Sequence, residues 1–172
     1  KFKLNMVIMS ISTGLITSLI PNLSSSFSTQ NIEDVKNKIN QALQILLYTT
    51  IPMVVGLSFL TKPVWTTFYG SSTWGPRVYS FLVFITLFSA LFTISIVILQ
   101  SVNRYKMVFI CLFLGLITKI VLNVPLIYSF EKLGIYGFYG ANTATMLGYL
   151  VGIITSLIYL SKIFHISYEK TL

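Results

Sequence analysis

Lys119 is the one charged residue that lies well inside an apolar stretch of this sequence. An ammonium group in hydrocarbon costs roughly 2.5 kcal/mol or more, so such a residue normally faces a bundle interior, water or a partner. The acidic residues Glu33, Asp34, Glu131 and Glu169 all lie in or near links between apolar stretches. Lys119 therefore predicts a cavity that holds a polar or anionic group, or a side chain that snorkels to the nearer membrane surface.

Other polar side chains accompany this lysine. Asn123 lies one helical turn after Lys119 and Gly115 one turn before it, which predicts a polar stripe on one helix. The preceding apolar stretch carries a further set near one face: Thr86, Ser89, Thr93 and Gln100. These groups either line a hydrated cavity or bond to neighbouring helices and to their own backbone carbonyls.

Small residues recur at every fourth position near the end of the chain. They are Gly140, Ala144, Gly148, Gly152 and Ser156. Small side chains let two helix backbones approach closely, so this stripe predicts helix packing rather than ligand contact. Asn142, Thr145 and Tyr149 fall on another face of the same helix and are candidates to meet a cavity.

The residue types that support most enzyme chemistry are missing. There is no P-loop, HExxH, CxxC or GxSxG motif, and no pair of carboxylates at catalytic spacing. Cys111 is the only cysteine and His165 the only histidine, so neither an internal disulfide nor a metal cluster is expected. We expect no enzyme, no cofactor and no metal site, unless a catalytic part lies outside this sequence.

The composition indicates the elements that position these residues. Of the 172 residues, 55% are apolar and only 9% charged, and the mean hydropathy is +0.82. The apolar runs are long enough for helices that cross a bilayer, and they lack the alternation of β-barrel strands. We therefore predict an all-α, polytopic bundle that forms one transmembrane domain over residues 1–172. The expected spans are at about residues 4–21, 42–61, 78–100, 107–130 and 135–161.

Two features modify this simple pattern. Residues 31–41 follow a helical stripe of apolar side chains, which predicts either a short amphipathic helix at the membrane surface or the wet extension of the next span. Asn31 is the expected N-cap of that helix. Pro52 and Pro125 lie inside expected spans, where each removes a backbone hydrogen bond and is expected to kink the helix.

The net charge of +8 is distributed between the apolar runs. Basic residues there suit a membrane surface with its anionic lipids, and no basic cluster is interleaved with stacking aromatics, so nucleic acid is not an expected partner. One side of the membrane collects Lys36, Lys38, Arg104, Lys106, Lys162 and Lys170. The other side has Lys62, Arg77 and Lys132, together with Lys1 and Lys3. The positive-inside rule places the first side in the cytoplasm.

Three stretches resemble a known family. They are residues 18–70 ("SLIPNLSSSFSTQ…VWTTFYG"), 98–128 ("ILQSVNRYK…VLNVPLIY") and 134–152 ("GIYGFYGANTATMLGYLVG"). Together they are similar to bacterial polysaccharide-biosynthesis flippases, in the branch of the lipid II flippases (mouse virulence factor family) and the stage V sporulation protein B group. That branch belongs to the multidrug/oligosaccharidyl-lipid/polysaccharide exporter superfamily.

The resemblance implies an architecture and a substrate. Family members have two six-helix lobes around a central cavity, and this chain corresponds to most of the second lobe, so a missing N-terminal lobe is an expected partner. Alternating access in the bacterial cytoplasmic membrane would move a polyprenyl-pyrophosphate-linked saccharide. By the same resemblance, Lys119 takes a cavity role and Lys3 falls near a cationic position of the family. Alternatives are a drug or cation exporter, a membrane-embedded transferase and a non-transporting assembly protein.

Overall fold

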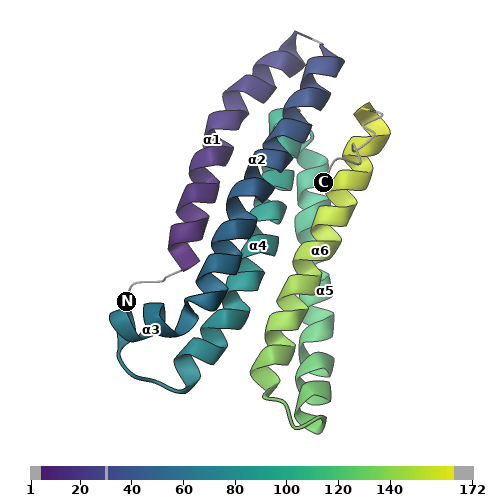
Figure 1. Ribbon diagram of the computed structural model, residues 1–172. Helices are drawn as coiled ribbons and strands as arrows, with labels where there is room; N and C mark the ends of the chain where they lie inside the picture. Colours follow the sequence, from purple (N-terminus) through teal and green to yellow (C-terminus); the bar gives the residue numbers. More distant parts are fainter. Residues whose placement is uncertain (1–4, 30, 165–172) are drawn as a thin grey trace.

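The computed structural model describes residues 5–29 and 31–164. Within them the chain forms helices and no strand. The helices are α1 (Asn5–Ser28), α2 (Ile32–Phe59), α3 (Thr61–Tyr69), α4 (Trp74–Ser101), α5 (Tyr105–Lys132) and α6 (Gly137–Phe164). Figure 1 shows the five long helices running back and forth along one direction, with the short α3 at one end.

Four of the helices are long and apolar enough to cross a membrane: α2, α4, α5 and α6. Each contains 28 residues, or about 42 Å of helix, against about 30 Å of hydrocarbon. The predicted all-α, polytopic bundle is confirmed. The remaining expected span, residues 4–21, begins outside the described residues and coincides with much of α1, which continues through Pro21 to Ser28.

Helix α2 joins two features that the sequence analysis treated separately. Residues 31–41 are not a helix of their own, because α2 runs without a break from Ile32 to Phe59. The amphipathic stretch is therefore an extension of the next span, which was the second of the two expected alternatives. Asn31 is the N-cap, and its side chain accepts a hydrogen bond of 3.1 Å from the backbone N–H of Asp34.

The structure also contains an element that was not expected. Residues expected to form a link after the second span form the nine-residue helix α3. Pro63 is tolerated there because it lies in the first turn, where backbone N–H groups have no partner within the helix. Helices α2 and α5 continue through Pro52 and Pro125, and a kink at each remains a prediction.

Helix α4 lies at the centre of the packing and contacts all the other helices. Helices α1 and α2 pack on it and on each other, while α5 packs mainly on α6 (Figure 1). The largest group of buried side chains lies mainly on α1, α2 and α4 and extends to α5 and α6. It includes Ile39, Leu46, Ile94 and Leu99. The α5–α6 turn is set by Gly134, whose positive φ of 71° closes the end of α5.

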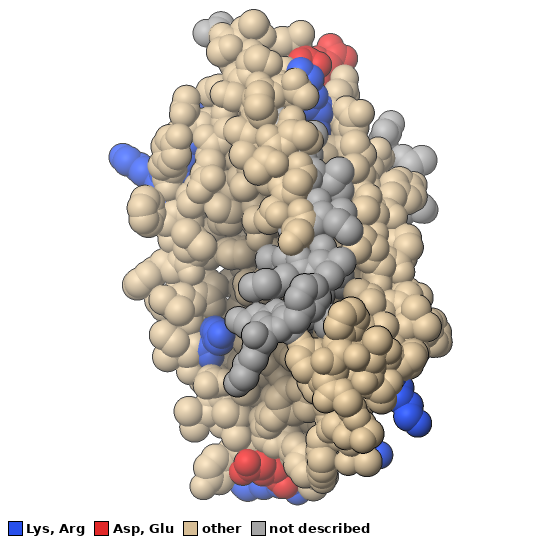
Figure 2. All heavy atoms as spheres, turned by 90° about the vertical axis from the view of Figure 1, so that its left-hand side faces the viewer, with Lys and Arg blue, Asp and Glu red and all other residues tan. Residues whose placement is uncertain are grey.

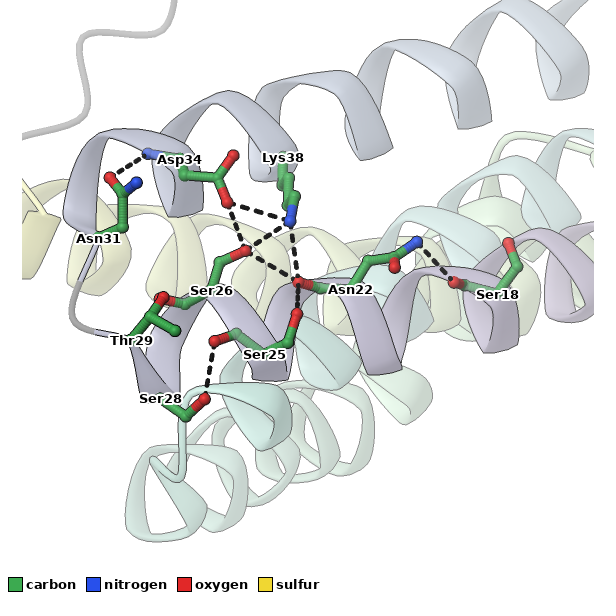
Figure 3. Close-up of polar contacts among 9 residues, drawn as sticks. All are labelled: Ser18, Asn22, Ser25, Ser26, Ser28, Thr29, Asn31, Asp34 and Lys38. Atoms are coloured by element: carbon green, nitrogen blue, oxygen red, sulfur yellow. Dashed lines mark hydrogen bonds and ion pairs between the residues drawn. The ribbon is translucent and has the colours of Figure 1, made fainter.

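A polar network fastens the α1–α2 turn (Figure 3). The Lys38 ammonium forms an ion pair of 3.0 Å with Asp34 and donates to the Ser26 hydroxyl and to the backbone carbonyl of Asn22. The Ser26 hydroxyl also lies within hydrogen-bonding distance of the Asp34 carboxylate. These bonds occur at the end of the bundle, where two ionised groups remain partly exposed.

Charged residues are concentrated toward the helix ends. On the face seen in Figure 2, acidic side chains gather at both ends of the molecule. Given the direction of each helix, the basic residues of the described segments lie at the same two ends as predicted from the sequence. Lys1, Lys3 and Lys170 lie outside the described segments. The orientation in the membrane remains a prediction.

Candidate functional site

A pocket of about 200 Å³ lies beside Lys119, about halfway along α5. Three helices line it. The lining residues are Phe92 from α4, Leu112, Gly115, Leu116 and Lys119 from α5, and Thr145, Gly148 and Tyr149 from α6. Because α5 is long and apolar enough to cross a membrane, a pocket halfway along it is expected near mid-membrane depth.

The floor of the pocket is a close contact between two glycines. A Cβ built on Gly148 would lie 2.8 Å from the backbone oxygen of Gly115 and 3.4 Å from the Cβ of Lys119. The backbone of α6 therefore passes directly against the base of the lysine side chain. Only residues without side chains allow this approach, because a methyl group on either glycine would collide with backbone atoms.

An aromatic pair forms one wall of the pocket. The rings of Phe92 and Tyr149 have their centroids 5.4 Å apart, in a tilted arrangement. Phe92 also packs against Gly152, where an added Cβ would lie 2.3 Å from the phenyl ring. The position of Phe92 in this aromatic wall therefore depends on the missing side chain at Gly152 of α6.

The polar side chains of the pocket are the Lys119 ammonium group and the hydroxyls of Thr145 and Tyr149. Lys119 is exposed and contributes an ammonium group, while the Thr145 hydroxyl donates 3.1 Å to the carbonyl of Ala141 in its own helix. No acidic residue is among those lining the pocket. An ammonium without a carboxylate, surrounded by apolar and aromatic side chains, suits an anionic group better than a cation.

The pocket brings together only some of the residues proposed from the sequence. Lys119 and Gly148 line it, whereas Asn123 and Asn142 are half-buried and do not. Thr93 is also outside it, and its hydroxyl donates 2.8 Å to the carbonyl of Ser89. Lys3 lies outside the described residues.

The polar face of α4 bonds mainly to its own backbone. Thr86 donates to Leu82, and Ser95 to Leu91, each through the carbonyl four residues earlier. Together with the bond made by Thr93, these contacts fit the alternative in which hydroxyls satisfy themselves within the helix.

The small residues of α6 lie at its contacts with other helices. A Cβ on Gly140 would lie 2.5 Å from the backbone oxygen of Leu126 in α5, and Ala144 is completely buried. Gly148 and Gly152 meet Gly115 and Phe92 as described above. The stripe therefore runs along the packed side of α6 and also forms part of the pocket floor.

Several lining residues were not identified from the sequence. Phe92, Leu112 and Leu116 belong to long apolar runs, and nothing in their residue types separates them from lipid-facing neighbours. Thr145 and Tyr149 were noted as a face that could meet a cavity, together with Asn142, which lies elsewhere. The signal available in the sequence was the spacing of Thr145 and Tyr149, which are one helical turn apart. In the structure both residues line the same pocket as Lys119 of the neighbouring helix.

The described residues contain no group of three or more His, Cys, Asp or Glu side chains that could hold a metal ion. Cys111 is a free, buried thiol on α5. The pocket itself offers one ammonium group, hydroxyls and aromatic surface.

The fold and this pocket define a class: a multi-pass helical membrane protein with a cationic pocket between its helices. Over 171 residues the chain is 34% identical to a protein of Bacillus subtilis (strain 168) described as lipid II flippase MurJ. This covers 97% of the chain, which spans 30% of the length of that relative. The chain is therefore similar to part of a lipid II flippase. No family model and no solved structure matches the chain.

Proposed function

We propose that this chain is part of a flippase for polyprenyl-pyrophosphate-linked saccharides, with lipid II as its substrate, in the cytoplasmic membrane of a bacterium. The observation that carries the proposal is the pocket at Lys119, which presents an ammonium without a carboxylate near the middle of the bundle. The similarity of this chain to a lipid II flippase, which extends over 97% of the chain, supports the same conclusion. The protein is then a transporter rather than an enzyme.

In this proposal Lys119 contacts the pyrophosphate while the headgroup crosses the membrane. A diphosphate carries the negative charge that an isolated ammonium group needs, and a low-dielectric environment strengthens their attraction. The aromatic wall formed by Phe92 and Tyr149 offers a flat apolar surface beside this charge. A second six-helix lobe, implied by the family resemblance, would complete the cavity.

The packing supports a division of the chain into parts for alternating access. Helices α5 and α6 make the most extensive contact in the bundle, and α4 is the main link from this pair to α1 and α2. Two helices that pack backbone to backbone are expected to move as a unit, while their less extensive contacts with neighbouring helices change. Lys119 lies on that pair, so movement of α5 and α6 would carry Lys119 with it and change its position relative to Phe92 on α4.

The test is flipping of labelled lipid II by the full-length protein in vesicles. Lys119→Gln keeps a polar side chain but removes the charge, and we expect flipping to fall at least about tenfold, as loss of a charge-assisted contact implies. Lys119→Arg retains the charge and should keep more activity than Lys119→Gln. Lys106→Gln is the matched control, because Lys106 is an exposed lysine in the first turn of the same helix.

The comparison is made at equal amounts of reconstituted protein. Flipping by Lys119→Gln at the rate of the unchanged protein would remove Lys119 from the mechanism. If Lys106→Gln lowered flipping as much as Lys119→Gln does, the cause would be loss of surface charge in general and not loss of a contact in the pocket.

A further inference from the structure

A second and larger hollow lies at one end of the bundle, beside the turn that joins α1 to α2. Figure 1 shows this turn. The volume of the hollow is about 590 Å³, within the range of about 300–1,000 Å³ usual for ligand sites. The lining residues are Ser24, Phe27, Ser28, Ile32, Val35, Asn103, Arg104 and Ile163. We call this hollow the end groove.

The end groove is separate from the Lys119 pocket. The two share no lining residue. Arg104 is the N-cap residue of α5 and precedes Lys119 by fifteen residues. This separation corresponds to about 22 Å along the helix axis. A ligand at the end groove would therefore lie near one membrane surface while the Lys119 pocket lies near the middle.

Polar and charged groups form one part of the end groove. Arg104 supplies an exposed guanidinium, and Asn103, Ser24 and Ser28 supply an amide and two hydroxyls. Among the described residues, the one ion pair joins Lys38 to Asp34, so Arg104 has no acidic partner there. Arg104 also precedes the first turn of α5, an end that no side chain caps. Guanidinium and helix N-terminus both favour a phosphate.

Apolar side chains form the other part. Phe27 and Ile32 come from the α1–α2 turn, Val35 from the next turn of α2, and Ile163 from the end of α6. Val35 is almost fully buried, with 1% of its surface exposed, whereas Ile32 is 55% exposed. An apolar floor beside a guanidinium matches a molecule whose anionic headgroup continues directly into a hydrocarbon chain.

We propose that the end groove binds an anionic phospholipid, with its phosphate at Arg104 and the upper part of an acyl chain on Phe27, Ile32 and Ile163. The location supports this occupant, because the groove opens where helices long enough to span the bilayer reach its surface. Basic pockets between membrane helices on the cytoplasmic side recognise such headgroups. The lipid would join α1, α2, the α4–α5 turn and α6, which are far apart in the sequence. This proposal does not depend on the transport proposal.

The test measures lipids that stay bound to the purified full-length protein by native mass spectrometry, from micelles containing equal amounts of phosphatidylglycerol and phosphatidylcholine. We expect the unchanged protein to retain phosphatidylglycerol in preference to phosphatidylcholine. Arg104→Gln should weaken retention of phosphatidylglycerol about tenfold, as loss of a charge-assisted hydrogen bond implies. Lys106→Gln, which removes a charge two residues away but outside the groove lining, should change retention less than about twofold.

A second variant tests the groove by shape instead of charge. Ile32→Trp leaves every charge in place and fills the apolar floor, so retention of phosphatidylglycerol should fall here too. Ile32 is half-exposed, so a larger side chain is accommodated without disturbing the core. Equal retention of both lipids by the unchanged protein would overturn the proposal. So would equal losses in Arg104→Gln and Lys106→Gln, or normal retention by Ile32→Trp.

Discussion

Gly115 on α5 and Gly148 on α6 face one another so closely that a Cβ on either would lie within 3 Å of the other's backbone oxygen, at 2.9 Å and 2.8 Å respectively. Both glycines also line the pocket beside Lys119. The same contact therefore holds the two helices together and sets the shape of the candidate site. Changes at this point should affect stability and transport together.

Replacing Gly148 with alanine should destabilise the protein. The added methyl group meets a backbone oxygen, which cannot rotate away, so α5 and α6 must separate. Overpacking of this kind costs about 1–3 kcal/mol. Thermal unfolding of the purified protein in detergent should show a lower midpoint, and lipid II flipping should fall at the same time.

Gly56→Ala is the control for this change. Gly56 also lies within a spanning helix, α2, but a Cβ built there meets nothing within 4 Å. Alanine at such a position should be neutral or stabilise by about 0.4–1 kcal/mol. Equal destabilisation by Gly56→Ala and Gly148→Ala would mean that helix flexibility, and not the α5–α6 contact, controls the result.

Tyr79 should tolerate loss of its hydroxyl group. Only 3% of Tyr79 is exposed, and its hydroxyl has no hydrogen-bond partner among the described residues. A buried polar group without a partner costs about 1–3 kcal/mol. Tyr79→Phe should therefore keep or raise the midpoint of thermal unfolding, whereas exposed Tyr128→Phe should not change it. If the free energy of unfolding fell by more than about 1 kcal/mol in Tyr79→Phe, the hydroxyl would have a hydrogen-bond partner.

The transmembrane helices could be predicted because their signal is a run of residues. Length and hydropathy identify α4, α5 and α6 without reference to any neighbour, and their ends lie within a few residues of those expected. Helix α3 was missed because it is short and rich in aromatic and β-branched residues, whose helix propensities are low. It is stabilised by packing on α2 and α4, because Trp65 joins a buried cluster that contains Val54 of α2 and Tyr79 of α4. The sequence does not reveal these contacts.

The site was only partly predictable for a related reason. Lys119 stands out because a charge in an apolar run is costly wherever the helix packs. Asn123 and Asn142 carry the same kind of polar signal, yet neither lines the pocket, since the crossing of α5 and α6 at Gly115 and Gly148 decides which face is open. That crossing is a relation between two helices and has no counterpart in the periodicity of either one.

The ion pair of Asp34 with Lys38 should contribute little by itself. Both side chains are partly exposed, at 40% and 31%, and such pairs are worth about 0.2–1 kcal/mol. A double-mutant cycle with Asp34→Asn and Lys38→Gln should give a coupling energy in that range. The coupling should shrink in high salt, because mobile ions screen exposed charges. A coupling above about 2 kcal/mol that is insensitive to salt would indicate a pair shielded from solvent in the assembled membrane protein.

The pocket beside Lys119 should contain water when the protein is embedded in a bilayer, and two cysteine variants can test this. Leu116 lines the pocket and is 53% exposed; Leu114 is also exposed, at 39%, but does not line it. These residues are two apart on α5, so they point to nearly opposite sides at almost the same depth.

Maleimide reacts with the thiolate, which forms in water and not in hydrocarbon. In a Cys111→Ala background, Leu116→Cys should therefore be labelled faster than Leu114→Cys in intact vesicles. A labelled precursor lipid bound at Lys119 should slow the reaction at Leu116→Cys alone. Equally slow labelling of both cysteines would indicate that lipid covers the two faces alike. Lys119 would then reach the membrane surface by snorkelling, and its proposed contact with the pyrophosphate would have no aqueous cavity in which to occur.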